Sequence, residues 1–272
     1  MMINKVYRPS QLPYLEGRYA LDSNNCYRRH SHPTFSLGVV EQGRGRHYQE
    51  HRTQPIGPGA VVAINADVVH NCNPYANQNW GYHMLYIECD WLAALARDIG
   101  AAHGSHPSSA PMWQPVAYDA DLYRDIVALN YQLSSGADAL DTQTRLVDLL
   151  GRLLHNQNHR RGRPEPPASH PAIMRARDYL HDNTHRSVTL EELAGIAQLS
   201  PYHLIRRFKR EIGLPPHAYQ VNVRVNRAKQ LLREKMSIAE VAAATGFSDQ
   251  AHLQRNFKSH TAMTPAQYRN AH

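Results

Sequence analysis

The stretch SIAEVAAATGFSDQAHLQRNFKSHTAMTPAQY, residues 237–268, has the pattern of a helix-turn-helix unit. Ser237 stands three residues before a glutamate, which is the spacing of a reciprocal capping box that opens a helix. Gly246 adopts positive φ easily and can end that helix. Leu253 and Phe257 then fall at i and i+4, so one side of a second helix is predicted to point inward.

The side of this second helix opposite Leu253 and Phe257 is polar. Gln and Arg side chains make bidentate hydrogen bonds to adenine and guanine edges, although a polar helix face can also be simply solvated. A DNA-reading helix is therefore one interpretation of this face. The residues predicted to contact DNA here are Gln250, Ala251, Gln254, Arg255 and, as a phosphate neutraliser, Lys258.

The same unit occurs twice in the chain. Thr189 and Glu192 repeat the capping-box spacing, and the outward residues of the first copy's second helix are also polar or basic. An internal match with aromatic, Pro and Lys positions in register indicates a duplicated structural unit. At an offset of 49 the pairs are His203/His252, Leu204/Leu253, Arg206/Arg255, Phe208/Phe257, Lys209/Lys258, Pro216/Pro265 and Tyr219/Tyr268.

The two copies and the segment between them resemble the DNA-binding domain of the AraC-type transcription regulators. The resemblance implies an all-α domain over residues 172–272, with helix-turn-helix units at about 189–212 and 237–260. A long helix from Pro216 to Glu234 would join them. By position in the family motif, the predicted DNA contacts of the first copy are Tyr202, Ile205, Arg206, Arg207 and Lys209, the first three of them as base readers.

Two features of this region carry further expectations. Ala262 stands where the family usually has the helix-ending glycine that Gly213 supplies in the first copy, so strain is expected there. Along the joining helix, Arg224, Arg227 and Lys229 are predicted to be solvated or to contact DNA phosphates.

The bulk composition is that of a globular protein with room for two domains. The 272 residues are 42% hydrophobic, and neither a membrane-spanning run nor a signal-peptide core is apparent, so we expect a cytoplasmic protein without membrane contact. Three widely spaced cysteines argue against a disulfide framework. The net charge of +7 arises entirely from residues 172–272, which have 15 Lys and Arg against 8 Asp and Glu. This asymmetry indicates a nucleic-acid-binding domain beside a neutral one.

The first 160 residues have the sequence pattern of a small β-barrel. Residues 1–25 are expected to be irregular, as an arm or edge strand. From Cys26 onward, short strands alternate with Gly and Pro turns, and Trp80–Glu88 has period-2 alternation. The order His30-x-His32, Gly43, Pro58-Gly59, His70 resembles the cupin-like sensor domain of AraC-type regulators.

Three histidines are the principal candidates for chemistry in this half. His30 and His32 at i and i+2 on a strand share one face, and His70 from a facing strand can complete a metal site. The carboxylate that metal-dependent cupin enzymes carry four or five residues after the His-x-His pair is missing, so no metal is expected as the first choice. Cys72 can serve as a further soft ligand and would favour zinc.

The same histidines have two other possible roles, of which the lining of an effector pocket is preferred over the metal site. They can form the polar lining of an effector pocket, together with Tyr82 and Tyr86, or they can be structural. Cys26, Cys72 and Cys89 offer a separate interpretation as oxidant-sensing thiols.

The barrel is followed by two amphipathic helices, at 119–133 and 141–155, which either cover the barrel or also form a homodimer interface, as they commonly do in the family. Residues 161–171, rich in Pro, Arg and polar side chains, are predicted to be a linker. The fold class is therefore α+β multidomain: a cupin-like β-barrel with two or three helices over 1–160, then an all-α tandem helix-turn-helix domain.

These features predict a sequence-specific DNA-binding transcription regulator, not an enzyme, controlled by a small-molecule effector in the barrel. Its partners would be double-stranded DNA, the effector, a second copy of the chain and, by family resemblance, RNA polymerase; no cofactor is expected. Two alternatives stay open: a metal-dependent cupin enzyme fused to a DNA-binding domain, and a constitutive regulator without an effector.

Overall fold

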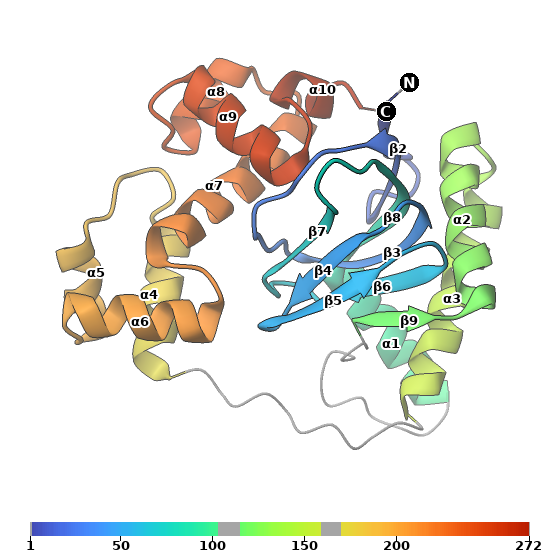
Figure 1. The fold of residues 1–272 in the computed structure, drawn as a ribbon, viewed down its shortest axis with the longest axis horizontal. Coiled ribbons are helices and arrows are strands. Elements are labelled where there is room, and N and C mark those ends of the chain that lie inside the picture. The colour runs from blue at the N-terminus through green and yellow to red at the C-terminus, as the bar shows by residue number, and fades with distance from the viewer. Residues whose placement is uncertain (1, 103–114, 159–169, 272) are drawn as a thin grey trace.

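The computed structural model describes residues 2–102, 115–158 and 170–271. These residues form a barrel lobe, made of β1–β9 and α1–α3, and a helical lobe, made of α4–α10 (Figure 1). The linker predicted at 161–171 lies outside the described residues except for its last two positions, of which Pro171 begins α4. None of the helices in the described parts is both long and apolar enough to span a bilayer.

The strands of the barrel lobe pair antiparallel in two sheets, ordered β1-β2-β8-β3-β6-β9 and β5-β4-β7. Apolar side chains from both sheets, such as Ile56, Val62 and Trp80, pack in the space between them. The strands are β1 (Ile3–Tyr7), β2 (Leu15–Ser23), β3 (Thr34–Gln42), β4 (Gly45–Gln49), β5 (Arg52–Ile56), β6 (Ala60–Ile64), β7 (His70–Pro74), β8 (Trp80–Glu88) and β9 (Val116–Tyr118).

The predicted alternation of Trp80–Glu88 is present in β8. Leu85 and Ile87 point to the outer face of the larger sheet and are fully buried there against helices. Trp80, Tyr82, Met84 and Tyr86 point to the inner face, between the sheets. The strand therefore separates the helix-packing core from the interior of the barrel.

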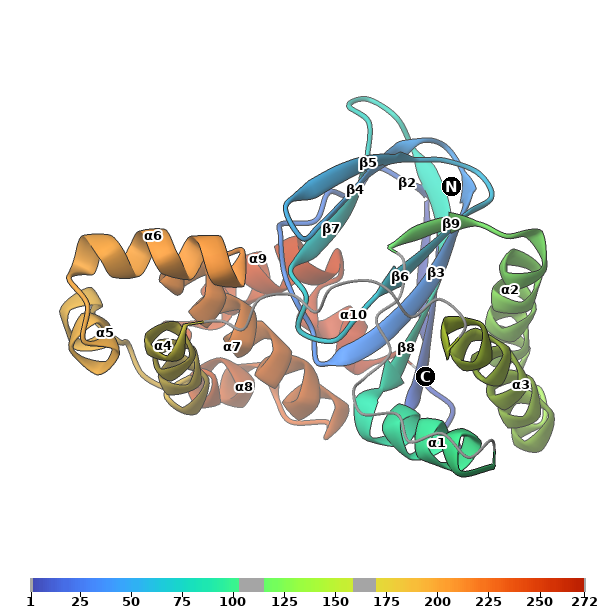
Figure 2. The same cartoon turned by 90° about the horizontal axis from the view of Figure 1, so that it is seen from below.

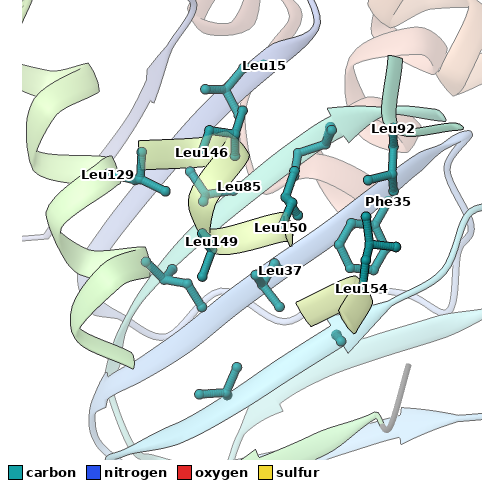
Figure 3. Packing of buried hydrophobic residues seen from close by; sticks show 14 of the residues in the cluster. Leu15, Phe35, Leu37, Leu85, Leu92, Leu129, Leu146, Leu149, Leu150 and Leu154 are labelled. Carbon is teal, nitrogen blue, oxygen red and sulfur yellow. The ribbon is translucent and has the colours of Figure 1, made fainter. Parts of the chain in front are cut away.

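Three helices cover the outer face of the larger sheet. Leucines of α2 and α3 interdigitate with Phe35, Leu37 and Leu85 from the sheet (Figure 3). The amphipathic stripes read from the sequence thus bury one face of each helix. The helices are α1 (Cys89–Ala102), α2 (Ala120–Ser135) and α3 (Ala139–Asn158).

The N-terminal segment differs from the expectation of an irregular arm. Residues 3–7 and 15–23 form β1 and β2, and β2 lies inside the sheet between β1 and β8. The alternative of an edge strand holds for β1, which lies at the edge of the sheet. The inner strand β2 was missed because its inward positions include Glu16 and Arg18, which are buried in a polar network and hide the hydrophobic alternation.

The helical lobe contains both predicted helix-turn-helix units, α5–α6 and α8–α9, joined by α7. Each unit has its own apolar cluster, centred on Leu204 and Phe208 in the first and on Leu253 and Phe257 in the second. The helices are α4 (Pro171–Asp182), α5 (Leu190–Ala197), α6 (Pro201–Ile212), α7 (Pro216–Arg233), α8 (Ile238–Ala244), α9 (Gln250–Thr261) and α10 (Pro265–Arg269).

The sequence repeat corresponds to a repeat of contacts. The ring of Phe208 meets that of Tyr219 edge-on, with centroids 5.6 Å apart, and Phe257 meets Tyr268 in the same way at 5.3 Å. The first helix of the second copy has the full capping box at Ser237. In the first copy only half of the expected box forms, because the Glu192 carboxylate binds Arg186 instead of turning back.

Ala262 adopts the left-handed conformation that its position requires. It is the C-cap of α9 with φ 55° and ψ 19°, and Gly213 caps α6 with φ 88°. A residue with a Cβ atom is disfavoured in this region of φ/ψ space, so the expected strain is present at Ala262.

Candidate DNA-binding surface and ligand cavity

The predicted DNA-contacting residues lie on the outward faces of α6 and α9. Leu204, Phe208, Leu253 and Phe257 anchor these helices and are fully buried. The amide N–H groups of the first turns are capped by N-cap side chains, so each helix starts at a defined point. Exposed on the outward faces are Tyr202, Ile205, Arg206, Lys209, Gln250, Ala251, Gln254, Arg255 and Lys258.

The first recognition helix has a partly apolar face. Tyr202 is 61% exposed and Ile205 is 39% exposed, so both can reach a partner. Arg206 donates to the Tyr202 hydroxyl at 2.8 Å. Arg207 differs from the other candidates, because it is half-buried and pairs with Glu211 at 3.4 Å.

Two of the cations predicted to face DNA along α7 point elsewhere. Arg224 is only 6% exposed, and its guanidinium donates to the backbone carbonyls of Thr184 and Arg186. Lys229 lines a cavity against the barrel lobe. Arg227 is exposed, as predicted. The error arose because helical periodicity alone cannot show which neighbour covers each side of a joining helix.

The helical lobe docks on the barrel lobe on the side away from α2 and α3 (Figures 1 and 2). Ser31 of the barrel lobe receives the Asn222 side-chain amide at its hydroxyl and the Asn226 amide at its carbonyl. The backbone N–H of Arg28 donates to the carbonyl of Ser259 in α9. Polar contacts from both α7 and α9 therefore fix the interface.

A cavity lies between the two sheets, and residues of α7 and α9 of the helical lobe complete part of its wall. The space between its wall atoms, including the part open to solvent, is about 930 Å³. All five predicted effector residues, His30, His32, His70, Tyr82 and Tyr86, line it. Its apolar wall includes Val6, Ile56, Val62, Ile64, Trp80 and Met84.

Two cations face this cavity from opposite lobes. Arg18 of β2 is buried and donates through Nε and Nη2 to the Asn4 side-chain oxygen, which is a neutral partner. The ammonium of Lys229 in α7 lies 5.6 Å from the Tyr86 ring centre. Burial lowers the pKa of Lys229 to about 8, against an opposing effect of Glu16. Within the described residues, neither cation forms an ion pair with a carboxylate inside 4 Å.

The acidic residue of the cavity wall, Glu16, is already neutralised. Its carboxylate accepts from Arg8 at 2.7 Å, from Arg233 at 2.9 Å and from the Tyr268 hydroxyl at 3.1 Å. Burial would raise the pKa of Glu16, but Lys229, Arg8 and Arg233 together lower it to about 2. The cavity is therefore left with an excess of positive charge.

The three candidate histidines come together at the edge of the cavity next to α9. His30 and His70 exchange two backbone hydrogen bonds, of 2.9 and 3.0 Å, so their side chains are held side by side. One ring nitrogen from each of His30, His32 and His70 lies within 4.8 Å of the others. Burial and the neighbouring imidazoles keep the pKa of His30 and of His32 well below the usual value, and burial lowers that of His70 to about 4.

Cys72 does not join this cluster, contrary to its proposed role as a fourth ligand. Its sulfur lies 3.0 Å from Nδ1 of His47, and burial raises the pKa of the thiol to about 12. Burial also raises the pKa of the Cys89 thiol. A high thiol pKa disfavours the reactive thiolate, so these two cysteines are poorly suited to sensing oxidants.

Sequence reasoning missed the residues that close the cavity. Arg18 reaches the cavity because β2 pairs with β8, whereas docking of the helical lobe brings Asn222, Lys229 and His260 there. One feature of the sequence could have indicated this part of the wall. Asn222 and Asn226 lie on the inward side of the joining helix, where apolar residues are expected.

Comparison with known proteins gives consistent matches over both lobes. The family described as AraC-like ligand binding domain matches residues 12–150, and a helix-turn-helix domain family matches residues 193–271. The HTH-type transcriptional activator RhaR of Escherichia coli is 25% identical over 263 residues, covering 93% of this chain and 89% of RhaR. The uncharacterized HTH-type transcriptional regulator YbfI of Bacillus subtilis is 26% identical over 228 residues, covering 84% of this chain and 81% of YbfI.

Among solved structures, ToxT of Vibrio cholerae has the same overall fold. The apo form of a ToxT variant superposes with a TM-score of 0.60 at 11% identity, covering 99% of this chain and 97% of ToxT. A second ToxT structure, with an unsaturated fatty acid bound, has a TM-score of 0.58 at 12% identity and covers 99% of this chain and 95% of ToxT.

Proposed function

The chain belongs to the AraC family of DNA-binding transcription regulators, and we propose that a small acidic molecule bound between its lobes controls it. Its relatives are transcription regulators and not enzymes, so the alternative of a metal-dependent cupin enzyme does not hold. The observation that carries the proposal is the cavity whose wall combines barrel residues with residues of α7 and α9.

The wall of the cavity supports an effector with an apolar body and an anionic group. Val62, Trp80 and Met84 offer apolar contact, and the two cations without a bound carboxylate, Arg18 and Lys229, offer the counter-charge. One ToxT structure contains an unsaturated fatty acid, and another contains a methylnaphthalenyl butenoic acid. Both of these ligands are carboxylic acids.

An anion held by both Arg18 and Lys229 would link the lobes directly. Arg18 belongs to β2 and Lys229 to α7, the helix that joins the two DNA-reading units. Such a bridge would stabilise the docked arrangement and thereby change how α6 and α9 are presented to DNA.

A thermal-shift series with the full chain tests this proposal. Monounsaturated fatty acids and arylbutenoic acids should raise Tm, whereas the matched alcohols should not. The Lys229→Met variant should bind the acids at least about 10-fold more weakly, the loss expected for one charge-assisted contact. The Lys258→Met variant, altered on the exposed face of α9, is the matched control and should respond like the parent protein. Equal Tm shifts by acids and alcohols would refute the proposed role of the two cations in binding the effector. If none of the acids or alcohols shifts Tm, a constitutive regulator without an effector is favoured.

We propose the face of α2 and α3 remote from the helical lobe as the homodimer interface. Tyr131 and Leu140 on these helices are 71% and 73% exposed. Sedimentation equilibrium should show a dimer that the double change Tyr131→Glu, Leu140→Glu dissociates. The Ile196→Glu control, on exposed α5, should remain dimeric. A parent protein that is monomeric at all concentrations would contradict this assignment.

A regulator of this kind works where the chromosome and RNA polymerase are. We therefore place the protein in the cytoplasm, with double-stranded DNA as its main partner and RNA polymerase as a further one, following the family.

A further inference from the structure

Three histidine side chains at the edge of the cavity are held in one shared orientation. Nδ1 of His30 lies 2.7 Å from the carbonyl oxygen of Arg28, Nδ1 of His32 lies 3.0 Å from that of Thr34, and Nδ1 of His70 lies 2.8 Å from that of Val68. A carbonyl oxygen only accepts hydrogen bonds, so each Nδ1 carries the proton. Each Nε2 therefore presents a lone pair, and at His32 the Ser36 hydroxyl, 3.5 Å from Nε2, would have to give up its contact for a metal to bind.

This pattern is the one that prepares an imidazole for a metal. Metal-binding histidines commonly donate their second ring N–H to a backbone carbonyl or carboxylate, which fixes the tautomer and orients the ring. Here the same arrangement occurs at His30, His32 and His70, which come from the segment before β3 and from β7. A purely structural role for the rings does not require all three tautomers to agree.

The spacing of the three rings also fits one ion. One ring nitrogen of each histidine lies within 4.8 Å of one ring nitrogen of each of the others, and the ring centres of His30 and His32 lie 4.5 and 4.7 Å from that of His70. Zn–N bonds of about 2.0–2.1 Å in a tetrahedron place two ligand atoms about 3.3 Å apart, so small inward rotations of the rings suffice. All three residues line the cavity, which gives an ion a route to Nε2.

We propose that His30, His32 and His70 bind one divalent ion of the zinc class through their Nε2 atoms. Neutral imidazoles favour late first-row ions such as Zn²⁺, Co²⁺, Ni²⁺ and Cu²⁺, and the absence of a carboxylate from this described cluster disfavours Mg²⁺ and Ca²⁺. Because the three histidines line the cavity, a further ligand can reach the ion from that side.

The helical lobe supplies a further imidazole beside this site. His260 of α9 is 7% exposed, and its ring centre lies 6.3 Å from that of His30. Its Nδ1 lies 2.7 Å from the carbonyl oxygen of Asn256, so its Nε2 is also a free acceptor. His260 of the helical lobe is therefore placed to interact with the ion, either as a ligand or by a hydrogen bond to a water molecule bound to it.

Titration of the tag-free, full-length protein with Co²⁺ and Zn²⁺, without any organic effector, tests the site. After removal of metal by a chelator, one equivalent of Co²⁺ should bind and give the intense visible bands of a four-coordinate ion, and Zn²⁺ should displace it. X-ray absorption of the Zn²⁺ form should show scattering from at least three imidazoles. Binding of several equivalents with weak six-coordinate bands would indicate scattered surface histidines and overturn the proposal.

Variants separate this site from other histidines of the chain. His32→Ala and His70→Ala should each weaken Zn²⁺ binding by more than about 100-fold, beyond the 10–100-fold loss typical of an outer-shell partner. His83→Gln, on the opposite face of β8, and His203→Ala, on exposed α6, should bind like the parent. If His32→Ala and His70→Ala fold by circular dichroism yet keep the parent affinity, the assignment is wrong.

If the alanine variants do not fold, the X-ray absorption spectrum of the parent decides the matter. A single site without three imidazoles refutes the assignment. Because no acid is present in these titrations, a negative result leaves the proposed acidic effector untouched, and a negative acid screen leaves the metal site untouched.

Discussion

Glu16 shows how one buried side chain ties the two lobes together. It belongs to β2, but two of its hydrogen-bond partners, Arg233 and Tyr268, belong to the helical lobe. Arg8 completes the set and also stacks on the Tyr268 ring, with its guanidinium carbon 3.9 Å from the ring centre. A carboxylate held this way contributes to folding and to docking only while it is ionised.

The Glu16 carboxylate should make stability fall at acid pH. The surrounding cations lower its folded pKa from 4.5 to about 2, so its contribution is complete above pH 4.5 and is lost as the pH falls towards 2. The contribution is about 3 kcal/mol, from about 1.4 kcal/mol for each pKa unit. Urea unfolding of the parent and of Glu16→Gln should differ most at pH 7, and the difference should shrink between pH 4.5 and pH 2. A difference that stays constant with pH, or one equal to that of the exposed control Glu191→Gln, would show that the charge is not the cause.

Exposed side chains of α9 should determine which DNA sequence is bound. Gln254 and Arg255 point outward, opposite the buried Leu253 and Phe257. Gln254→Ala and Arg255→Ala should each cost about 1–3 kcal/mol on the selected site and relax the preference at one or two base pairs. Binding to selected and random duplexes at one salt concentration measures this. Equal losses on both duplexes would mean that these residues contact only phosphates.

The turn that ends α9 differs from its counterpart in the first half of the repeat. Gly213 ends α6 without a steric cost, whereas Ala262 must hold φ 55° with a Cβ atom. The Ala262 carbonyl also receives the Asn4 side chain of β1 at 3.1 Å, so docking of the lobes fixes this turn. The element keeps its strained end because packing on both sides requires the chain to reverse there.

Ala262→Gly should stabilise the protein. Relief of the left-handed strain is worth about 1 kcal/mol, offset in part by the loss of a buried methyl group. The reciprocal change Gly213→Ala should destabilise by more than about 1 kcal/mol, because φ is 88° there and a Cβ atom would lie 3.1 Å from Val69. Thermal melts should show a Tm above that of the parent protein for Ala262→Gly and a Tm below it for Gly213→Ala. If Ala262→Gly melts below the parent, the lost contact outweighs the strain.

In the whole molecule, the net positive charge and the cavity lie mostly in different parts of the chain. Residues 172–272 carry all of the net charge of +7, and they contain the exposed faces of α6 and α9. Residues 1–171 are neutral in sum, with 15 Lys and Arg against 15 Asp and Glu, and the barrel lobe within them forms most of the cavity wall. Hydrogen bonds among Ser31, Asn222 and Asn226 hold these two parts together at the interface.

A fragment of residues 165–272 should bind DNA by itself with a steep dependence on salt. Each neutralised phosphate contributes about −0.9 to the slope of log affinity against log salt concentration. Lys258→Ala should reduce the slope by about 1, whereas the exposed but uncharged change Ala251→Ser should leave it unaltered. Fluorescence anisotropy between low and physiological salt measures the slope. A folded fragment whose affinity hardly changes with salt would contradict the electrostatic interpretation.

Local features of the sequence were sufficient to predict the duplicated helix-turn-helix units, the period-2 strand β8 and the outward residues of α6 and α9. Capping residues, left-handed turns and the i, i+4 spacing act over a few residues, so they can be read directly from the chain. The grouping of His30, His32 and His70 was also foreseeable from the His-x-His spacing, although His30 and His32 lie in the segment before β3 and not on the strand that was expected.

Only the tertiary structure decided which residues from distant segments meet. β2 was missed because its inward Glu16 and Arg18 are satisfied by partners far along the chain, and Arg224 and Lys229 were misplaced because docking covers them. Burial and pairing of a charge depend on what packs against it, and a local pattern contains no record of that neighbour. The part of the cavity wall that α7 and α9 supply, and the meeting of Arg18 with Lys229 and of His30 with His260 across the cavity, follow from docking alone.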